Sequence, residues 1–297
     1  MSRDLNFMRT ALRLAQRGLG NVWPNPAVGC VLVAPPKAGG HVLGRGWTQP
    51  GGRPHAETVA LDQARARFGA DALVGAQAFV TLEPCSHTGR TPPCADALIE
   101  AGIGRVVIAC EDPDPRVSGT GTERLRSSGM EVETGLCGPE AEAVNAGFLT
   151  RVRTGRPLVM RKIATTSDGR IATRTGASQW ITGAQARAQA HLMRARHDAI
   201  AVGVGTVIAD DPSLTVRLPG LEERSPLRVV LDSGLRIPVT ARLVTTARDI
   251  PTWVIASEGA PSDRRAALEG AGVQVVEVAS RDGHVDPLAA LEALGAA

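Results

Sequence analysis

Aromatic and lysine side chains are scarce in this sequence. It has no tyrosine, and aromatic residues make up only 3% of its 297 residues. Such a chain offers few rings on which the bases of single-stranded nucleic acid could stack. Only two of its 33 basic residues are lysine, and 30 acidic residues leave a net charge of +3. This balance gives no bulk electrostatic reason to expect binding to nucleic acid or to a membrane.

Long apolar runs are also absent. No stretch approaches the ~20 apolar residues that span a bilayer, and the N-terminal segment lacks the apolar core of a signal peptide. We therefore expect a cytoplasmic protein. Its five cysteines are an odd number, and in a reducing compartment they favour metal ligation or burial over a disulfide framework.

The chain is long enough for two domains, because a single core seldom grows beyond ~250–300 residues. We place the boundary at Gly155-Arg156-Pro157, which gives domains of residues 1–154 and 155–297. Helical and strand patterns alternate in both, so each is predicted to be α/β. In the first domain we expect helices over 4–17, 55–68, 94–101, 121–128 and 139–153, and strands over 28–33, 41–47, 78–82, 105–110 and 131–136.

The second domain is predicted to have strands over 158–165, 199–204, 227–231, 252–256 and 273–278, and helices over 182–196, 262–269 and 286–294. Its Gly203-Val204-Gly205 segment is only weakly similar to a dinucleotide fingerprint. Ile208 replaces the third glycine, and Asp210-Asp211-Pro212 leaves no room for a helix close behind. We therefore reject a Rossmann-type site.

Four residues of the first domain predict a catalytic zinc site. His55 and Cys94 each follow a proline at an expected helix start, and Cys85 ends a strand. One histidine and two thiolates leave the fourth zinc position open for chemistry. Glu57 lies two residues from His55, where it suits a general acid/base that does not ligate the metal. The sequence His-x-Glu followed by Pro-Cys is the signature of zinc deaminases, although eight residues separate Cys85 from Cys94 where that signature has two.

The other cysteines and a nearby histidine have simpler interpretations. His87 could compete as a ligand, but we favour a loop or substrate contact because three protein ligands are already present. Cys30, Cys110 and Cys137 lie in or near strands and are expected in the core.

Longer motifs add a family resemblance that covers both halves in order. The loop Pro84-Cys85-Ser86-His87-Thr88-Gly89-Arg90-Thr91-Pro92-Pro93-Cys94 resembles the insertion of the bifunctional riboflavin-biosynthesis deaminase/reductase family. Five further segments of this sequence resemble the same family, at residues 25–33, 52–57, 162–170, 178–182 and 205–217.

The resemblance implies a cytidine-deaminase-like domain followed by a dihydrofolate-reductase-like domain. The first would use Zn²⁺, held by His55, Cys85 and Cys94, to deaminate a small phosphorylated pyrimidine, with Glu57 as the proton shuttle. The second would use NADPH to reduce the ribosyl group to ribityl. Carried over by position, its cofactor contacts are Ala164, Trp180, Thr206, Asp210 and Ser233, and its substrate contacts are Ser178, Arg194, Leu214 and Arg217. The two arginines suit a 5′-phosphate.

Three further expectations follow. The sequence stops without the Glu-Gly-Gly turn of the family, so we expect an incomplete reductase domain with poor reductase activity. A homo-oligomer is possible by analogy. The alternatives are a deaminase that acts on flipped-out nucleic-acid bases, which the near-neutral charge disfavours, and a zinc-stapled scaffold protein, which the retained Glu57 disfavours.

Overall fold

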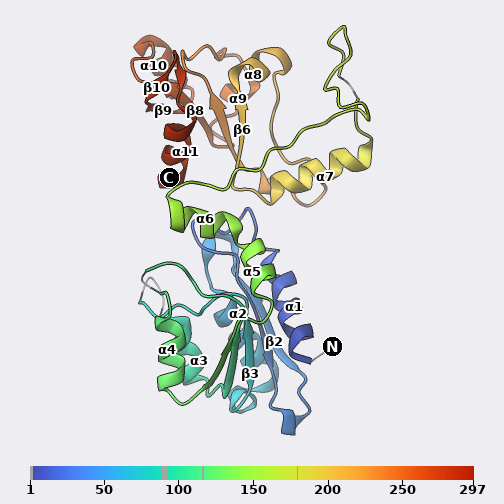
Figure 1. Ribbon diagram of the computed structural model, residues 1–297, viewed down its shortest axis with the longest axis vertical. Coiled ribbons are helices and arrows are strands. Elements are labelled where there is room, and N and C mark those ends of the chain that lie inside the picture. Colours follow the sequence, from blue (N-terminus) through green and yellow to red (C-terminus); the bar gives the residue numbers. More distant parts are fainter. Residues whose placement is uncertain (1–2, 89–91, 116, 179) are drawn as a thin grey trace. The chain divides into compact units, whose positions relative to one another are not determined.

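A computed structural model describes residues 3–88, 92–115, 117–178 and 180–297 of the chain (Figure 1). The chain divides into two compact units, residues 1–155 and 156–297. This division falls one residue after the boundary that the sequence suggested. Each unit contains its own sheet, and the two are described separately below.

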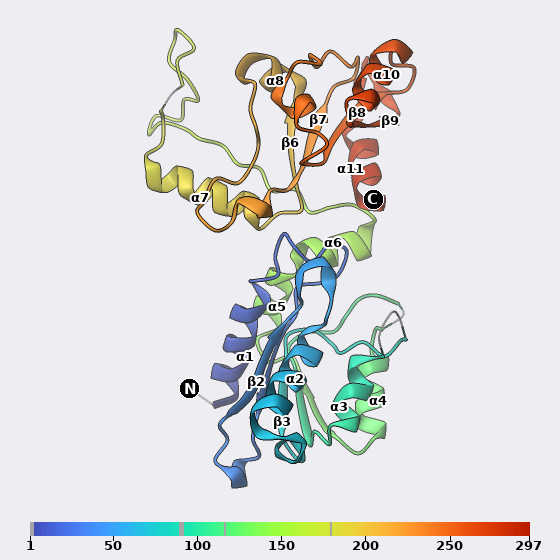
Figure 2. The same ribbon diagram turned by 180° about the vertical axis from the view of Figure 1, so that it is seen from behind.

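Unit 1 is a three-layer α/β structure around a five-stranded sheet with the order β2-β1-β3-β4-β5. β1 pairs antiparallel with β2 and β3, whereas β3, β4 and β5 are parallel. Helices α1 and α5 lie together on one face, and α2 lies on the other, where it is followed by α3 and α4 (Figures 1 and 2). The elements are α1 (Arg3–Ala15), β1 (Gly29–Val33), β2 (Val42–Trp47), α2 (Ala56–Phe68), β3 (Gln77–Val80), α3 (Cys94–Glu100), β4 (Arg105–Ile108), α4 (Thr120–Ser127), β5 (Glu131–Thr134), α5 (Gly138–Val144) and α6 (Ala146–Thr154), with short 3-10 turns at Pro36–Ala38, Pro50–Gly52 and Ala70–Leu73.

Glycines in β1 and β2 let the helices lie directly on the sheet. A Cβ at Gly29 would come within 1.9 Å of the Ala11 carbonyl oxygen in α1. On the opposite face, a Cβ at Gly46 would come within 2.0 Å of the Ala56 carbonyl oxygen in the first turn of α2. No side chain fits at these positions, so the glycines set how closely the start of α2 approaches β2.

The predicted helix over 139–153 is wrong in one respect: it is two helices, α5 and α6, which meet at Asn145. Asn145 has backbone angles of φ −100° and ψ 17°, outside the helical range. Its buried side chain accepts a hydrogen bond from the Ala27 N–H (2.9 Å) and donates one to the Ala27 carbonyl (3.0 Å). The break between α5 and α6 thus coincides with hydrogen bonds between Asn145 and Ala27, which are 118 residues apart in the sequence.

Unit 2 contains a parallel four-stranded sheet with the order β6-β7-β8-β9. Apolar clusters cover both faces: Val230 and Val254 belong to one, Val229 and Ile255 to the other. The elements are α7 (Ala184–Ala195), β6 (Ala199–Gly203), α8 (Val204–Asp210), a 3-10 turn (Glu222–Arg224), β7 (Leu227–Leu231), α9 (Arg242–Thr245), β8 (Thr252–Ser257), α10 (Ser262–Gly270), β9 (Gln274–Val278), β10 (Ser280–Arg281), β11 (His284–Val285) and α11 (Pro287–Ala296).

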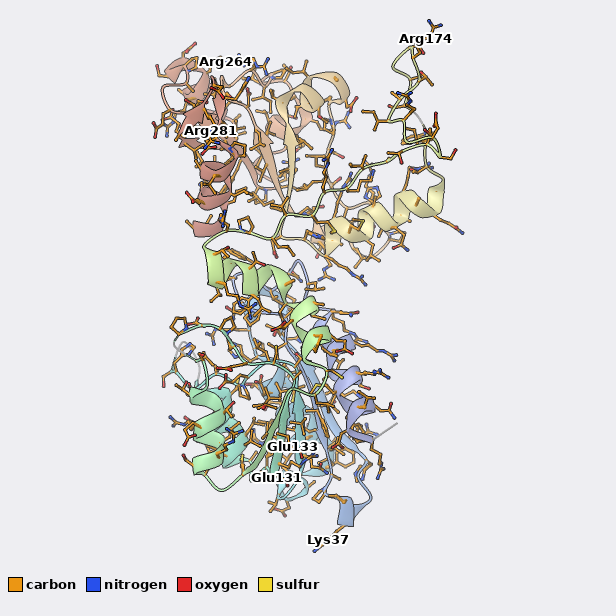
Figure 3. All side chains as sticks on the ribbon, viewed as in Figure 1. Lys37, Glu131, Glu133, Arg174, Arg264 and Arg281 are labelled. Carbon is orange, nitrogen blue, oxygen red and sulfur yellow. The ribbon has the colours of Figure 1, made fainter. Side chains whose placement is uncertain are left out.

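Two expectations for unit 2 are wrong. The segment 158–165 is not a strand; it pairs with no strand of the described sheet, and Leu158, Val159 and Ile163 are at least half exposed. Figure 3 shows Arg174 at the tip of the long loop that follows it. A helix, α8, does follow β6 directly, because its seven residues end at Asp210, and Asp211 (φ 38°) turns the chain before Pro212. The argument that no helix had room was mistaken.

Within the described ranges, no helix is both long and apolar enough to cross a membrane.

Candidate active site

Three side chains meet at the carboxyl end of β3 and at the starts of two helices. His55 caps the N-terminus of α2, Cys94 is the first residue of α3, and Cys85 lies beyond β3. The His55 Nδ1 atom lies 3.2 Å from the Cys94 sulfur and 3.7 Å from the Cys85 sulfur. All three candidate ligand atoms lie within 4.8 Å of one another.

This spacing fits one zinc ion. Zinc bonds of about 2.0–2.3 Å in tetrahedral geometry separate neighbouring ligand atoms by roughly 3.5 Å, close to the distances found here. The backbone supports the cluster as well: the Cys94 N–H donates to the Cys85 sulfur (3.3 Å), and the Ala95 N–H donates to the Cys85 carbonyl (3.1 Å). The ligand set is thus assembled by the fold of the chain itself.

The protonation states also favour a cation. A hydrogen bond from the Cys94 thiol lowers the pKa of Cys85 to about 4, despite its burial. The same hydrogen bond raises the pKa of Cys94 well above the usual value for a thiol. A hydrogen bond to Cys85 raises the pKa of His55. These opposite shifts favour a thiolate at Cys85, and a thiolate is the form that ligates a divalent cation.

Glu57 lies beside this cluster in the first turn of α2 and is only 3% exposed. Burial raises the pKa of its carboxyl group, although the positive charge on His55 opposes the shift. A buried carboxyl group with a raised pKa is suited to exchanging protons near neutral pH. The position of Glu57 depends on Gly46 in β2. A side chain there would collide with the carbonyl group of Ala56, the residue between His55 and Glu57.

A cavity of about 630 Å³ opens onto these residues. His87, for which the sequence suggested a loop or substrate contact, lines it, and the neighbouring motif residues Gly89, Arg90 and Thr91 lie outside the described residues. Sequence reasoning missed the other polar side chains of the walls, namely Asn25, Arg53, Glu83, Asp112, Asp114 and Arg151.

A signal for some of these residues was available. Asp112 and Asp114 follow β4, which pairs in parallel with β3, and β3 leads to Cys85. The carboxyl ends of adjacent parallel strands meet at one edge of a sheet, so polar residues after β4 could have been placed near Cys85.

In unit 2 the structure brings three of the nine predicted cofactor and substrate residues together. The Arg194 guanidinium donates to the Thr215 carbonyl (3.0 Å), and the Arg217 guanidinium donates to the Ser213 hydroxyl (3.1 Å). Leu214 lies between these two acceptors with φ 54°. The Arg217 N–H also donates to His191 Nδ1 (3.2 Å).

His191 was missed by the sequence reasoning, although it lies one helical turn before Arg194 on α7. Burial, followed by the charges of Arg194 and Arg217, lowers its pKa. Burial and the charge of Arg217 likewise lower the pKa of Arg194. Both shifts indicate a cluster of positive charge, which an anion would relieve.

The remaining six predicted residues are more scattered. Thr206 and Asp210 lie on the exposed side of α8, and Ser233 follows β7, where its hydroxyl accepts from the Val285 N–H (2.9 Å). Trp180 is 72% exposed, with the Arg187 guanidinium 4.5 Å from its ring centre. Ala164 and Ser178 belong to the same irregular segment as Trp180, and the intervening motif residue Gln179 lies outside the described residues.

The fold and the first site place this chain among two-domain proteins that join a zinc deaminase to a second α/β domain, and comparison with known families agrees. Residues 1–110 match the cytidine and deoxycytidylate deaminase zinc-binding region, and residues 157–297 match the RibD C-terminal domain. The riboflavin biosynthesis protein RibD of Escherichia coli is 43% identical over 99% of this chain and 78% of its own length. That of Aquifex aeolicus is 44% identical over 92% of this chain and 73% of its own length.

Solved structures give the same result. RibD of Acinetobacter baumannii is 41% identical, with a TM-score of 0.83 over 98% of this chain and 76% of its own. A protein from Thermotoga maritima, named diaminohydroxyphosphoribosylaminopyrimidine deaminase/5-amino-6-(5-phosphoribosylamino)uracil reductase, is 39% identical, with a TM-score of 0.79 over 92% of this chain and 80% of its own. This chain belongs to the RibD family of riboflavin biosynthesis proteins. The predicted family and fold class are thereby confirmed.

Proposed function

We propose that unit 1 hydrolytically deaminates diaminohydroxyphosphoribosylaminopyrimidine, the substrate in the name of the Thermotoga relative. The observation that carries this proposal is the buried Glu57 carboxyl group beside three converging candidate zinc ligands. Glu57 and two of these ligands, His55 and Cys85, line one cavity. A purely structural zinc site would need neither an acid/base beside the ligands nor an open cavity.

His55, Cys85 and Cys94 would hold the zinc, because their ligand atoms have the required spacing and the pKa of Cys85 is lowered toward the thiolate form that binds metals. Zinc bound by three protein ligands keeps one position open and activates water at neutral pH. His55 and Cys85 both line the cavity, so a substrate in the cavity could reach a metal that they hold.

Glu57 is the proton carrier of this reaction. Its carboxylate takes a proton from the attacking water and delivers it to the amino nitrogen that leaves the pyrimidine ring. One water is consumed, one ammonia is released, and an oxygen replaces the amino group. Burial favours the neutral form of Glu57 after the first transfer, which keeps the proton available for the leaving nitrogen.

The polar cavity walls suit a pyrimidine that carries a sugar phosphate. Arg53 and Arg151 offer guanidinium donors, and Asn25, Asp112 and Asp114 offer amide and carboxylate groups from other sides of the cavity. Donors and acceptors distributed in this way can recognise the exocyclic groups of a ring while they orient it toward Glu57.

We propose that unit 2 then reduces the ribosyl group of 5-amino-6-(5-phosphoribosylamino)uracil with NADPH. Arg194 and Arg217 would bind the 5′-phosphate, with Leu214 and Ser178 as further substrate contacts. The two guanidinium groups bind residues two apart, Thr215 and Ser213, which supports this assignment. Ala164, Trp180, Thr206, Asp210 and Ser233 are proposed to contact the cofactor. A cytoplasmic location and a homo-oligomeric state stay predictions.

The test incubates the zinc-loaded protein with the diaminopyrimidine phosphate, with and without NADPH, and follows ammonia release and NADPH oxidation separately. We expect ammonia release in both conditions, and any NADPH oxidation to begin only after deamination has begun. NADPH oxidation with preformed uracil substrate tests unit 2 independently of unit 1. If the loaded protein releases no ammonia, the proposed deaminase function is wrong.

A further inference from the structure

Glu83 is a buried acid in the cavity wall that the proposed chemistry does not use. It lies after β3, two residues before Cys85, and its side chain is 4% exposed. A carboxylate so deeply buried is costly unless hydrogen bonds compensate it. The contacts of Glu83 therefore indicate what it does.

Three backbone N–H groups donate to the two carboxylate oxygens. Oε1 accepts from Thr122 at 2.8 Å, and Oε2 accepts from Gly119 at 3.1 Å and from Asp112 at 3.4 Å. These donors lie 29 to 39 residues further along the chain, on the segment that connects β4 to α4 and in the first turn of α4. A negative charge at the N-terminus of a helix is also electrostatically favourable.

Gly121 shows that this contact is built into the packing. A Cβ at Gly121 would come within 2.1 Å of the Pro84 carbonyl oxygen and within 3.3 Å of Glu83 Oε1. Only glycine lets the first turn of α4 lie directly against Glu83 and Pro84. The close contact between the end of β3 and α4 therefore depends on two residues: Glu83, which accepts the hydrogen bonds, and Gly121, which leaves room for them.

The segment that Glu83 holds is a wall of the cavity. Asp112, Asp114 and Val117 line the same space as His55 and Glu57. Glu83 lies two residues before Cys85 in the sequence, so its three hydrogen bonds connect the chain next to this candidate ligand to the wall that follows β4.

We propose that Glu83 is a positioning residue of the deaminase site, which holds the wall formed by residues 112–115 and 117–122 in register with the zinc ligands so that the pyrimidine is presented to Glu57. This role rests on the proposed deamination. Both oxygens of Glu83 are engaged by backbone donors, so it positions the wall and does not transfer protons. A displaced wall weakens substrate binding and alignment while the metal ligands remain in place.

The experiment compares Glu83→Gln with the wild-type protein. Glutamine keeps the size of the side chain but presents an NH₂ group to backbone donors, so at least one hydrogen bond is lost. We expect KM for the diaminopyrimidine phosphate to rise at least about tenfold and kcat/KM to fall about 10²-fold, because displacements of ~1 Å carry such costs. Zinc should stay at about one per chain, and the amides of Asp112, Gly119 and Thr122 should exchange with deuterium faster.

Glu133→Gln is the matched control. Glu133 lies on β5 (Figure 3). It pairs with Arg105 at 2.7 Å and is not among the residues that line the cavity. Its loss should leave KM and the three amides unchanged. The proposal is overturned if Glu83→Gln keeps kcat/KM within about twofold of wild type, or if it loses zinc while those amides keep their protection.

Gly121→Ala tests the same contact without altering Glu83, in case Glu83→Gln does not fold. The added Cβ should push α4 away from Pro84 and give the same rise in KM and the same faster exchange. A folded Gly121→Ala protein with unchanged kinetics and exchange contradicts the proposal. Failure of the proposed function looks different: wild type would release no ammonia, and amide exchange would still report whether Glu83 holds the wall.

Discussion

The two halves of this chain differ in how their candidate sites are built. In unit 1, ligands from one strand end and two helix starts converge within 4.8 Å, and buried hydrogen bonds fix the surrounding walls. In unit 2, Arg194 and Arg217 lie together, but Ala164, Ser178 and Trp180 belong to a segment without regular secondary structure.

This difference shows what makes a site rigid before any ligand arrives. The unit 1 residues are held by elements whose positions the core determines, down to glycines that admit a helix backbone. Within residues 156–178, the hydrogen bonds of Thr166 with Arg170 and of Thr173 with Ala177 join residues only four positions apart. Such local bonds do not fix a side chain relative to a distant sheet. The variants below test this contrast, from the largest expected effect to the smallest.

Cys85→Ser should abolish zinc binding and deamination. A serine hydroxyl is not the soft anionic ligand that zinc prefers, and Cys85 is the sulfur whose pKa is lowered to about 4. Elemental analysis should fall from about one zinc per chain in wild type to well below one. NADPH oxidation with preformed uracil substrate should be the same as in the wild-type protein, because unit 2 has its own core. Cys137→Ser, at the cap of α5, is the matched control; loss of zinc there as well would mean that the cluster is not the metal site.

Glu57→Gln should keep zinc but lose deamination by about 10²-fold or more, the usual contribution of a general acid/base. The loss should appear in kcat with KM little changed, whereas Glu83→Gln should also raise KM. Kinetics and zinc analysis on one preparation check this. If the glutamine variant lost its zinc, Glu57 would be a ligand and its assigned role would be wrong.

The sequence predicted the parts of the molecule that depend on local signals. His55 and Cys94 follow prolines at helix starts, and the structure has α2 and α3 beginning there. The parallel strands of both sheets were predicted from short apolar runs in the sequence. Helix starts and strands depend on residues close together in the chain, so a single sequence is enough to predict them.

The parts that could not be predicted depend on contacts distant in sequence. The break at Asn145 accompanies its hydrogen bonds with Ala27, and the role of Glu83 depends on donors in α4. Neither residue carries a local pattern. The missing strand over 158–165 is the converse case: its apolar residues fit a strand, but the described sheet of unit 2 pairs no strand with it. Apolar periodicity predicts a strand only where a partner strand exists.

Arg217→Ala should weaken binding of the phosphorylated uracil to unit 2 by about 1.5–3 kcal/mol, the scale of a charged hydrogen bond. Calorimetry with the phosphorylated and the dephosphorylated ligand checks this, and only the first should lose affinity. Arg281→Ala is the control, since Arg281 is exposed in the β10–β11 hairpin (Figure 3). Equal losses for both ligands would show that Arg217 acts through folding and not through the phosphate.

Val159→Ala should have the smallest effect, a change in the free energy of unfolding below about 0.5 kcal/mol. Val159 is 63% exposed, so truncation removes little buried surface. The same truncation at Val229, which is fully buried in β7, should cost about 2 kcal/mol from lost burial and the cavity left behind. Urea unfolding of the two variants measures the difference. A cost at Val159 as large as that at Val229 would mean that the 156–183 segment is packed in solution. The site of unit 2 would then be as firmly held as that of unit 1, and the contrast between the halves would fail.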